Sequence, residues 1–238
     1  FANEVYDVTD SEGQRFFLKI LKTQLPEVVA TEVQMQQRLL ANGLRTPEYL
    51  EIKPDEYVGN HGDTRFILSR YIPGESPTNV TLELIESFGA TLAKVHDALQ
   101  GVEIPPSKMQ WLNLERVEND LAGYYGDAKL LIEKLVQAGR VIFERGLPRA
   151  VTHGDLWMSN VFAENNTITT VFDLETAEYT VRLVDLARTY TSIRFNSDLS
   201  STQIIEVLTK GYDSVAESPL PSEERDNFNL AIAFVAGA

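Results

Sequence analysis

The 238-residue sequence contains no cysteine, which excludes disulfide bonds and thiolate metal sites and is compatible with a reducing compartment. Basic residues are also scarce: 21 Lys and Arg stand against 35 Asp and Glu, a formal net charge of −14. Nucleic acids and anionic membranes attract basic surfaces, so this charge argues against nonspecific binding to either partner. No stretch resembles a signal peptide, and no apolar run is long enough to cross a bilayer. We therefore expect a cytoplasmic protein.

The apolar content is sufficient for a folded protein: 43% of the residues are hydrophobic, enough to bury one large core or two smaller ones. The chain begins with Phe1 instead of an initiator Met, and residues 231–238 end within an apolar pattern without a helix stop signal. We therefore expect both ends of the chain to be truncated.

The most informative stretch is VTHGDLWMSN at residues 151–160, followed by a predicted hairpin. An apolar run on each side of an Asn-rich turn at residues 164–167 indicates two short strands. Antiparallel pairing about this turn would bring Asp173 beside Asn160, with Asp155 in the loop just before them. Three polar side chains would then meet at one place.

Such a group of side chains is suited to phosphoryl transfer from a nucleotide. An Asp such as Asp155 can orient an attacking hydroxyl and accept its proton. An Asn oxygen and a second carboxylate, here Asn160 and Asp173, can hold Mg²⁺, which prefers a few oxygen ligands and keeps water in its other positions. A Gly-Asp pair by itself is an ordinary turn, so the prediction depends on the three residues together. A Ser-His-Asp hydrolase is disfavoured because no G-x-S-x-G sequence occurs.

The order and spacing of these residues resemble the aminoglycoside phosphotransferase and choline kinase family, a small-molecule branch of the protein-kinase-like fold. The resemblance lies in His-Gly-Asp at residues 153–155, an Asn five positions after that Asp, and Asp-Leu-Glu at residues 173–175. It implies an α+β fold with two lobes. Residues 1–70 would form a small N-terminal antiparallel sheet with one helix that binds the nucleotide, and residues 71–238 a larger, mainly helical C-terminal lobe for catalysis and substrate binding. It also implies ATP and Mg²⁺ as cofactors.

Two predicted strands, residues 4–8 and 15–21, begin the N-terminal part. Lys19 in the second strand shares a face with apolar side chains, and the resemblance implies that it grips the nucleotide phosphates. Alternatively, Lys19 is an edge-strand lysine whose stem packs while its ammonium reaches water. Asn3 precedes the first strand, where the resemblance implies a phosphate contact from the nucleotide loop. The G-x-G-x-x-G sequence of protein kinases does not precede the second strand.

A helix is predicted from Pro26 to a stop signal at residues 42–43. Glu32 flanks its apolar stripe, and a carboxylate there can point inward and pair with Lys19, which would fix the ammonium for phosphate binding. The alternatives are that Glu32 is a solvated side chain, or that Glu27 in the first turn is the partner instead.

Further strands are predicted around residues 51–53 and 65–69, separated by a turn at residues 59–63. The Pro-Gly turn that ends at Gly74 resembles the hinge between the lobes of the family. The backbone that would bind the adenine edge there belongs to Ser69, Arg70 and Tyr71. By itself, a Pro-Gly pair indicates only a turn.

Helical spacing of apolar residues predicts a long helix ending at Gly101, a second around residues 114–121 and a third around residues 131–142. His96 lies beside the apolar stripe of the first, and we expect it to pack or bond structurally rather than act in catalysis. Residues 198–238 are expected to form helices of the substrate-binding lobe.

Four further residues near the motif are candidates for supporting roles. His153 is expected to hold the shape of the loop, and Trp157 either to line the acceptor pocket or to pack beneath it. Glu175 would position a metal-bound water or a cationic substrate. The resemblance implies that Asp185, at the start of the following helix, braces the catalytic loop.

These interpretations predict an ATP-dependent phosphotransferase that moves the γ-phosphate to a hydroxyl of a small molecule, and the acidic balance favours a cationic acceptor. Acceptors of the aminoglycoside, choline, homoserine and fructosamine types are all compatible, and the sequence predicts no oligomeric state. The alternatives are a nucleotide-binding pseudokinase without turnover and a protein kinase. The second is disfavoured because no Ala-Pro-Glu segment lies between Asp173 and Asp185.

Overall fold

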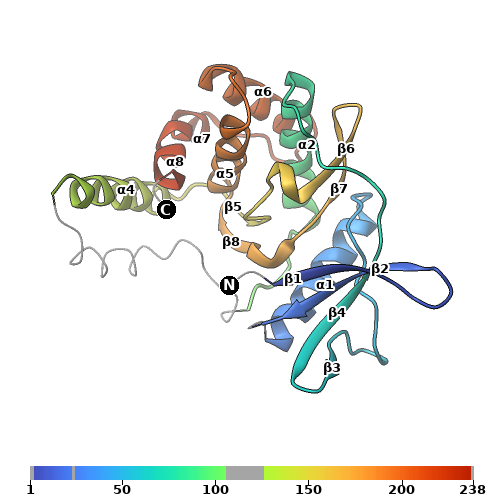
Figure 1. Cartoon of the computed structure of the whole chain (residues 1–238). Coiled ribbons are helices and arrows are strands. Elements are labelled where there is room, and N and C mark those ends of the chain that lie inside the picture. Colours follow the sequence, from blue (N-terminus) through green and yellow to red (C-terminus); the bar gives the residue numbers. More distant parts are fainter. Residues whose placement is uncertain (1–2, 23–24, 106–125, 237–238) are drawn as a thin grey trace.

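The polypeptide forms a small sheet with one helix against it, followed by a larger, mainly helical part (Figure 1). This computed structural model describes residues 3–22, 25–105 and 126–236. The α+β architecture that the sequence predicts is confirmed. The helix predicted around residues 114–121 lies outside the described residues, and a lobe boundary between residues 70 and 71 stays a prediction.

Four of the described strands form an antiparallel sheet in the order β1-β2-β4-β3. Their bounds are β1 Glu4–Thr9, β2 Arg15–Leu21, β3 Gly59–His61 and β4 Thr64–Arg70. Asp10 shapes the first turn, because its Oδ1 accepts hydrogen bonds from the backbone N of Glu12 at 2.9 Å and of Gln14 at 2.8 Å. In the resulting register Lys19 lies opposite Ile67. The sheet therefore holds Lys19 in one of its two central strands.

Two details of this sheet differ from the prediction. Residues 51–53 lie outside the sheet, in an irregular segment that ends in a tight turn at residues 53–56. Pro54 in this turn has no N–H to donate to a neighbouring strand. Residues 59–61, predicted as part of a turn, form the edge strand β3, because residues 62–63 are enough to reverse the chain.

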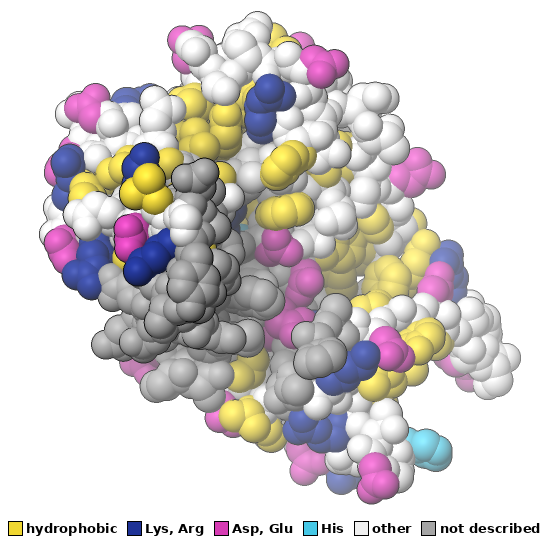
Figure 2. Space-filling model, turned by 60° about the vertical axis from the view of Figure 1, so that its left-hand side comes forward, with side chains coloured by type: hydrophobic (Ala, Val, Ile, Leu, Met, Phe, Trp, Pro, Cys, Tyr) yellow, Lys and Arg dark blue, Asp and Glu magenta, His cyan; other side chains and the backbone are white. Residues whose placement is uncertain are grey.

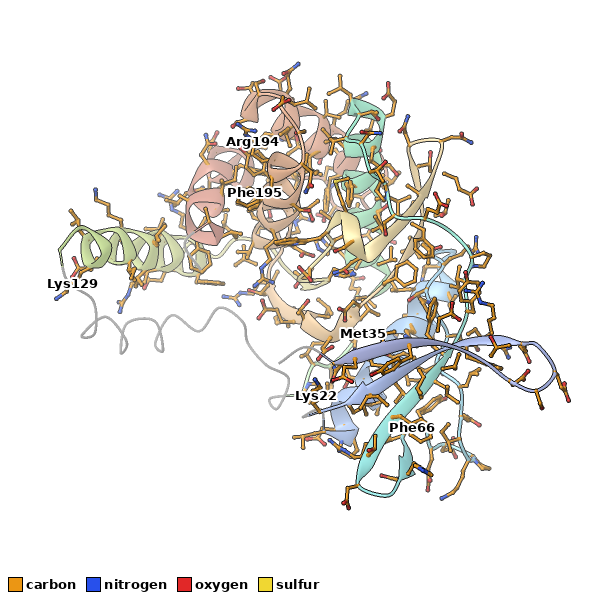
Figure 3. The ribbon with its side chains drawn as sticks, viewed as in Figure 1. Lys22, Met35, Phe66, Lys129, Arg194 and Phe195 are labelled. Carbon is orange, nitrogen blue, oxygen red and sulfur yellow. The ribbon has the colours of Figure 1, made fainter. Side chains whose placement is uncertain are left out.

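Helix α1 (Pro26–Ala41) lies between the sheet and the C-terminal part. A Pro in its first turn and Asn42 at its end match the predicted start and stop signals. Met35, which Figure 3 labels, is fully buried and packs with residues of the C-terminal part that include Val151 and Leu174. This shared core fixes α1 relative to the segment that carries the predicted catalytic residues.

The C-terminal part is mainly helical and carries two short strand pairs near the sheet (Figure 1). Its helices are α2 (Leu82–Ala98), α4 (Gly126–Glu144), α5 (Arg182–Phe195), α6 (Ser201–Asp213), α7 (Ser222–Asp226) and α8 (Phe228–Val235). Its paired strands are β5 (Arg149–Thr152) with β8 (Glu178–Val181), and β6 (Val161–Glu164) with β7 (Thr167–Val171). The predicted hairpin is confirmed as β6–β7. The helix predicted to end at Gly101 is confirmed as α2, and the helix predicted around residues 131–142 is confirmed as α4. Within the described ranges, every helix is too short or too polar to span a lipid bilayer.

Helices α2 and α6 touch through two glycines. A Cβ on Gly89 would lie 2.0 Å from the carbonyl O of Leu208, and a Cβ on Gly211 would lie 2.1 Å from that of Glu86. The two backbones therefore approach more closely than larger residues would allow. As a result Tyr212, the neighbour of Gly211, is held against α2.

Replacing Gly89 by Ala is expected to lower the free energy of unfolding by about 1–3 kcal/mol, the usual cost of an added group in a packed interface. The sign is informative, because Ala in place of Gly normally stabilises a helix by up to ~1 kcal/mol. Urea unfolding followed by circular dichroism measures the change. Ala90→Ser adds one atom at the neighbouring position and should stay within ~0.5 kcal/mol of the wild type. A Gly89→Ala variant as stable as the wild type would contradict the close packing.

Candidate active site

The β6–β7 hairpin brings the predicted polar residues together. Its two-residue turn consists of Asn165 and Asn166, both with positive φ, as is typical of tight hairpins. At its open end the backbone N of Phe172 donates to the carbonyl of Asn160 at 2.9 Å. Asp173 is the next residue after Phe172, so this hydrogen bond brings Asp173 close to Asn160.

Asn160 connects this hairpin to Asp155. Its Nδ2 donates to the backbone carbonyl O and to the side-chain Oδ2 of Asp155, each at 2.9 Å. Because the amide nitrogen is directed at Asp155, the amide oxygen of Asn160 lies on the other branch of the side chain, away from Asp155.

The loop of the His-Gly-Asp motif is fixed by hydrogen bonds on both sides of Gly154. The carboxylate of Asp185 accepts from the backbone N of His153 at 2.8 Å and of Gly154 at 2.9 Å. Arg188 donates from Nη1 to the Gly154 carbonyl at 2.9 Å. Gly154 itself has φ +83°, and a Cβ there would lie 2.4 Å from the carbonyl O of Thr176. The position therefore requires glycine.

His153 is fully buried and shapes the same loop. Its Nε2 lies 2.8 Å from the Phe172 carbonyl O, and its Nδ1 lies 3.2 Å from the backbone N of Asp155. A carbonyl accepts and an N–H donates, so Nε2 carries the proton and Nδ1 is the acceptor. Burial lowers the pKa of His153 despite nearby carboxylates, which favours this neutral form. The two hydrogen bonds of the ring hold the loop in shape.

Asp155 is half-buried, and burial raises the pKa of its carboxyl group. The negative charge of Asp173 acts in the same direction, while His153 and the hydrogen bond from Asn160 oppose it. A raised pKa makes the carboxylate a stronger proton acceptor than an ordinary exposed Asp.

Asp173 precedes the 3-10 turn η3 (Leu174–Thr176) and has a left-handed conformation, with φ +61° and ψ +74°. This conformation is uncommon for residues other than glycine and often occurs at functional sites. The exposed carboxylate of Asp173 and the amide oxygen of Asn160 are hard oxygen ligands of the kind that Mg²⁺ prefers. Across the described part of the chain, no three His, Cys, Asp or Glu side chains cluster in a way that could hold a metal ion. A cation at Asn160 and Asp173 would therefore complete its shell with water and phosphate oxygens.

Lys19 reaches from β2 to the residues that follow the hairpin. Its Nζ lies 2.7 Å from Oε2 of Glu175 and 3.9 Å from Oδ1 of Asp173. Burial by itself would lower the pKa of Lys19, but the charges of Glu32, Glu175 and Asp173 raise it above its ordinary value. The ammonium therefore keeps its charge.

The predicted partner of Lys19, Glu32, is buried in α1 beside Tyr49. The Tyr49 hydroxyl donates to Oε2 of Glu32 at 2.9 Å. Lys19 forms an ion pair with Glu175, a residue expected from the sequence to position a metal-bound water or a substrate. The alternative partner Glu27 is exposed, and a direct pair between Lys19 and Glu32 stays a prediction. The sequence does not identify Tyr49, because a single aromatic residue carries no spacing signal.

Asn3 contacts the same carboxylate. Its Nδ2 donates to the two carboxylate oxygens of Glu175 at 2.8 and 3.0 Å, and its Oδ1 accepts from the backbone N of Lys22 at 3.1 Å. Asn3 and Lys19 thus both hold Glu175 in place. A contact between Asn3 and phosphate stays a prediction.

The stretch predicted to bind adenine lies at the end of β4. Ser69 is buried and lies opposite Phe17 in β2. The backbone N of Arg70 donates to the carbonyl of Glu48 at 2.9 Å, and the Tyr71 ring lies 5.1 Å from that of Phe17. The Arg70 N–H is therefore already used, and the predicted adenine contact would involve other backbone groups of this stretch.

Two aromatic residues, Trp157 in the loop and Phe195 at the end of α5, are exposed. Trp157 is 40% exposed, and its place in or beneath an acceptor pocket stays a prediction. In α5, Arg188 bonds the Gly154 carbonyl and Ser192 accepts from the backbone N of Met158 at 3.4 Å, so this face of α5 follows the loop. Phe195, labelled in Figure 3, lies one turn beyond Ser192 on that face and is 80% exposed.

A buried polar chain leads from Asp185 into the C-terminal helices, and the sequence does not predict most of it. His96 Nε2 lies 3.1 Å from Oδ2 of Asp185, and His96 Nδ1 lies 3.0 Å from the hydroxyl of Tyr212. Nη1 of Arg182 lies 3.4 Å from the same hydroxyl, and Nη2 donates to Glu224 at 2.7 Å. Burial opposes ionisation of Asp185, but the hydrogen bond from His96 holds the pKa of this carboxyl below its ordinary value. Asp185 is therefore ionised.

Known proteins of similar sequence and structure are phosphotransferases and small-molecule kinases. The model of the APH phosphotransferase enzyme family matches residues 1–217. A homoserine kinase of Zymomonas mobilis is 24% identical over 215 residues, which make up 85% of this chain and 65% of that protein. The chain thus spans slightly less than two thirds of this curated relative.

Solved structures show the same fold. Amicoumacin kinase in complex with AMP-PNP, Ca²⁺ and Ami superposes with a TM-score of 0.78 at 17% identity, over 99% of this chain and 77% of that one. A choline/ethanolamine kinase family protein from Mesorhizobium loti gives a TM-score of 0.67 at 18% identity, over 100% of this chain and 74% of that one. The kinase-like fold expected from the sequence is confirmed.

Proposed function

Because the chain belongs to the phosphotransferase enzyme family, we propose that it transfers the γ-phosphate of ATP to a hydroxyl group of a small molecule. The observation that carries this proposal is the meeting of Asp155, Asn160 and Asp173 at one end of a hairpin. Lys19 reaches the same place, 3.9 Å from Asp173. Together they supply a proton acceptor, oxygen ligands for a cation and a positive charge for phosphate, the groups that phosphoryl transfer needs.

In this proposal the N-terminal part binds the nucleotide. Lys19 would bind phosphate oxygens, while Glu175 and Glu32 keep its ammonium charged and in place. The backbone at residues 69–71 would bind the adenine edge. Mg²⁺, for which Asn160 and Asp173 supply oxygen ligands, would when bound neutralise charge on the phosphates. The Ca²⁺ and AMP-PNP in the amicoumacin kinase complex support the use of a divalent cation and a nucleotide.

Asp155 would orient the acceptor hydroxyl and accept its proton. Asn160 fixes one carboxylate oxygen, Oδ2, so Oδ1 would face the hydroxyl. Its raised pKa suits this task, because the carboxylate must be ionised before the reaction and basic enough to take up the proton during it. His153 and Asp185 hold the loop, so the carboxylate would need little rearrangement when substrates bind.

The acceptor would bind beside the exposed rings of Trp157 and Phe195 and would carry a positive charge. Figure 2 shows acidic side chains gathered in the middle of one face of the molecule, and the chain has a formal charge of −14, which attracts cations. Exposed aromatic rings also bind cationic nitrogen through their π faces. Choline, homoserine, aminoglycosides and fructosamines all carry such a nitrogen and a hydroxyl. Homoserine and choline, the compounds in the names of two similar proteins, belong to this class of acceptors.

The test is ADP release by the full-length protein with ATP and Mg²⁺, measured against a panel of these acceptors. Each acceptor is paired with an analogue that lacks the hydroxyl group, and phosphorus NMR identifies the product as a phosphate monoester. ADP release that requires the hydroxyl would establish the activity and its substrate class. ATP binding without release for any acceptor would favour a silent pseudokinase, and failure to bind ATP would contradict the proposal. We also propose a cytoplasmic location, which suits an ATP-dependent protein without cysteine.

A further inference from the structure

We propose that Tyr212 is a positioning residue, which fixes the catalytic loop through His96 and Asp185. The inference rests on the proposed function, in which Asp155 accepts the proton of the acceptor. Tyr212 lies in α6 and is fully buried. It would act on Asp155 through two intermediate side chains and not by touching substrate.

The carboxylate of Asp185 is the end of this chain of contacts. Its Oδ1 accepts from the backbone N of Gly154 at 2.9 Å, and its Oδ2 accepts from the backbone N of His153 at 2.8 Å. These two peptide groups directly precede Asp155. The orientation of the Asp185 carboxylate therefore sets the direction from which the Asp155 side chain leaves the backbone. Small displacements of a reacting group are costly in catalysis, so this orientation matters for turnover.

His96 controls the same carboxylate from the other side. Its Nε2 shares Oδ2 of Asp185 with the loop amide, at 3.1 Å. A carboxylate accepts hydrogen bonds, so Nε2 is the donor, and in the neutral ring Nδ1 accepts. The hydroxyl of Tyr212 then donates to Nδ1 at 3.0 Å, and its oxygen accepts from Arg182 at 3.4 Å. The hydrogen bonds then run in one direction, from Arg182 to Tyr212, from Tyr212 to His96 and from His96 to Asp185.

Tyr212 is itself held from two directions. Gly211 and Gly89 bring α6 into backbone contact with α2, which carries His96. Arg182 fixes the hydroxyl and also donates to the carbonyl of Ser218 at 2.7 Å, in the segment that follows α6. A buried tyrosine normally needs some partner for its hydroxyl. Tyr212 differs from other buried tyrosines in what its partner contacts. Its partner His96 bonds the Asp185 carboxylate, which accepts from the backbone N of both His153 and Gly154.

The test is the variant Tyr212→Phe in the full-length protein, which keeps the ring and removes the hydroxyl. We expect kcat for ADP release to fall about tenfold while KM for ATP and acceptor stays within about twofold, because the group that is displaced acts in the chemical step. Tyr190→Phe is the matched control. Tyr190 is also buried, and its hydroxyl donates to Oγ of Ser201 at 2.8 Å in α6. Its loss should leave kcat unchanged.

A second measurement does not need turnover. Hydrogen exchange of the peptide that covers residues 151–156 reports on the two amides bound to Asp185. Tyr212→Phe should speed this exchange about tenfold, and Tyr190→Phe should not. Wild-type values of both kcat and exchange in Tyr212→Phe would overturn the proposal. A wild-type protein without turnover, in which Tyr212→Phe still speeds loop exchange, would overturn the proposed function and support the positioning of the loop.

His96 provides a second pair of variants in case Tyr212→Phe folds poorly. In His96→Gln the side-chain amide can still donate to Asp185, whereas His96→Leu removes the donor. We expect His96→Gln to retain about tenfold more kcat, and slower loop exchange, than His96→Leu. Equal kcat and equal exchange in the two variants would overturn the proposal.

Discussion

Replacing Asp155 by Asn is expected to lower kcat by on the order of 10²–10⁴-fold, the range that a positioned proton acceptor contributes. The substitution keeps the shape of the side chain, and the amide oxygen can still accept the hydrogen bond that Asn160 donates to Oδ2. What it removes is basicity. An amide does not take up the proton of the attacking hydroxyl, so the acceptor would have to react without a base.

ATP binding should stay near the wild-type value in Asp155→Asn, because Lys19 and Asp173, which we assign to phosphate and cation, are unchanged. Calorimetry with ATP and Mg²⁺ measures binding, and ADP release measures turnover. Asp226→Asn removes the same charge from an exposed position in α7 and should leave both quantities unchanged. Near-normal turnover in Asp155→Asn, or loss of ATP binding together with turnover, would contradict the separate roles of these residues.

Replacing Arg182 by Met is expected to lower the free energy of unfolding by about 3–5 kcal/mol, the usual cost of removing one partner of a buried ion pair. Glu224 is fully buried, and both Nε and Nη2 of Arg182 donate to its carboxylate, with the Nη2 contact at 2.7 Å. The Met side chain can fill much of the space of the Arg stem, so the loss would come mainly from the charge. Glu224 would then be left inside the protein without its counterion.

Urea unfolding measures this loss, and two further variants make it specific. Arg225→Met removes an exposed guanidinium that pairs with Asp213 and should cost no more than about 1 kcal/mol. Arg182→Met combined with Glu224→Leu leaves no buried charge and should recover about half or more of the loss. A loss in Arg182→Met no greater than in Arg225→Met would show that the buried pair does not stabilise the fold.

The elements that the sequence predicts correctly are those whose signals lie within the element itself. Pro26 and Asn42 mark the two ends of α1, and the Asn-rich turn closes the hairpin that brings Asn160 to Asp173. Turn chemistry and helical period act over a few residues, so one sequence is enough to detect them. β3 has only three residues, which is too short for an alternating pattern.

The ion pair between Lys19 and Glu175 could not be predicted, because packing between distant segments brings these two residues together. The sequence offers several carboxylates for one ammonium, and spacing does not rank them. Glu175 is 156 positions from Lys19, and its neighbour Leu174 packs in the same core as Met35 of α1. Tyr212 is hidden for the same reason, since nothing near it in the sequence indicates that its hydroxyl meets His96.

The hydrogen bond between His96 and Tyr212 spans 116 positions of the chain, and this separation has a consequence for synthesis. A chain made from its N-terminus contains the whole His-Gly-Asp motif well before α6 exists. Contacts between distant segments form late, because closing a long loop costs chain entropy before the contact is gained. A nascent chain that pauses before residue 212 would therefore carry every reactive side chain and still lack the hydroxyl that fixes His96. Full catalytic activity would be reached at the end of translation of this region, when α6 docks on α2.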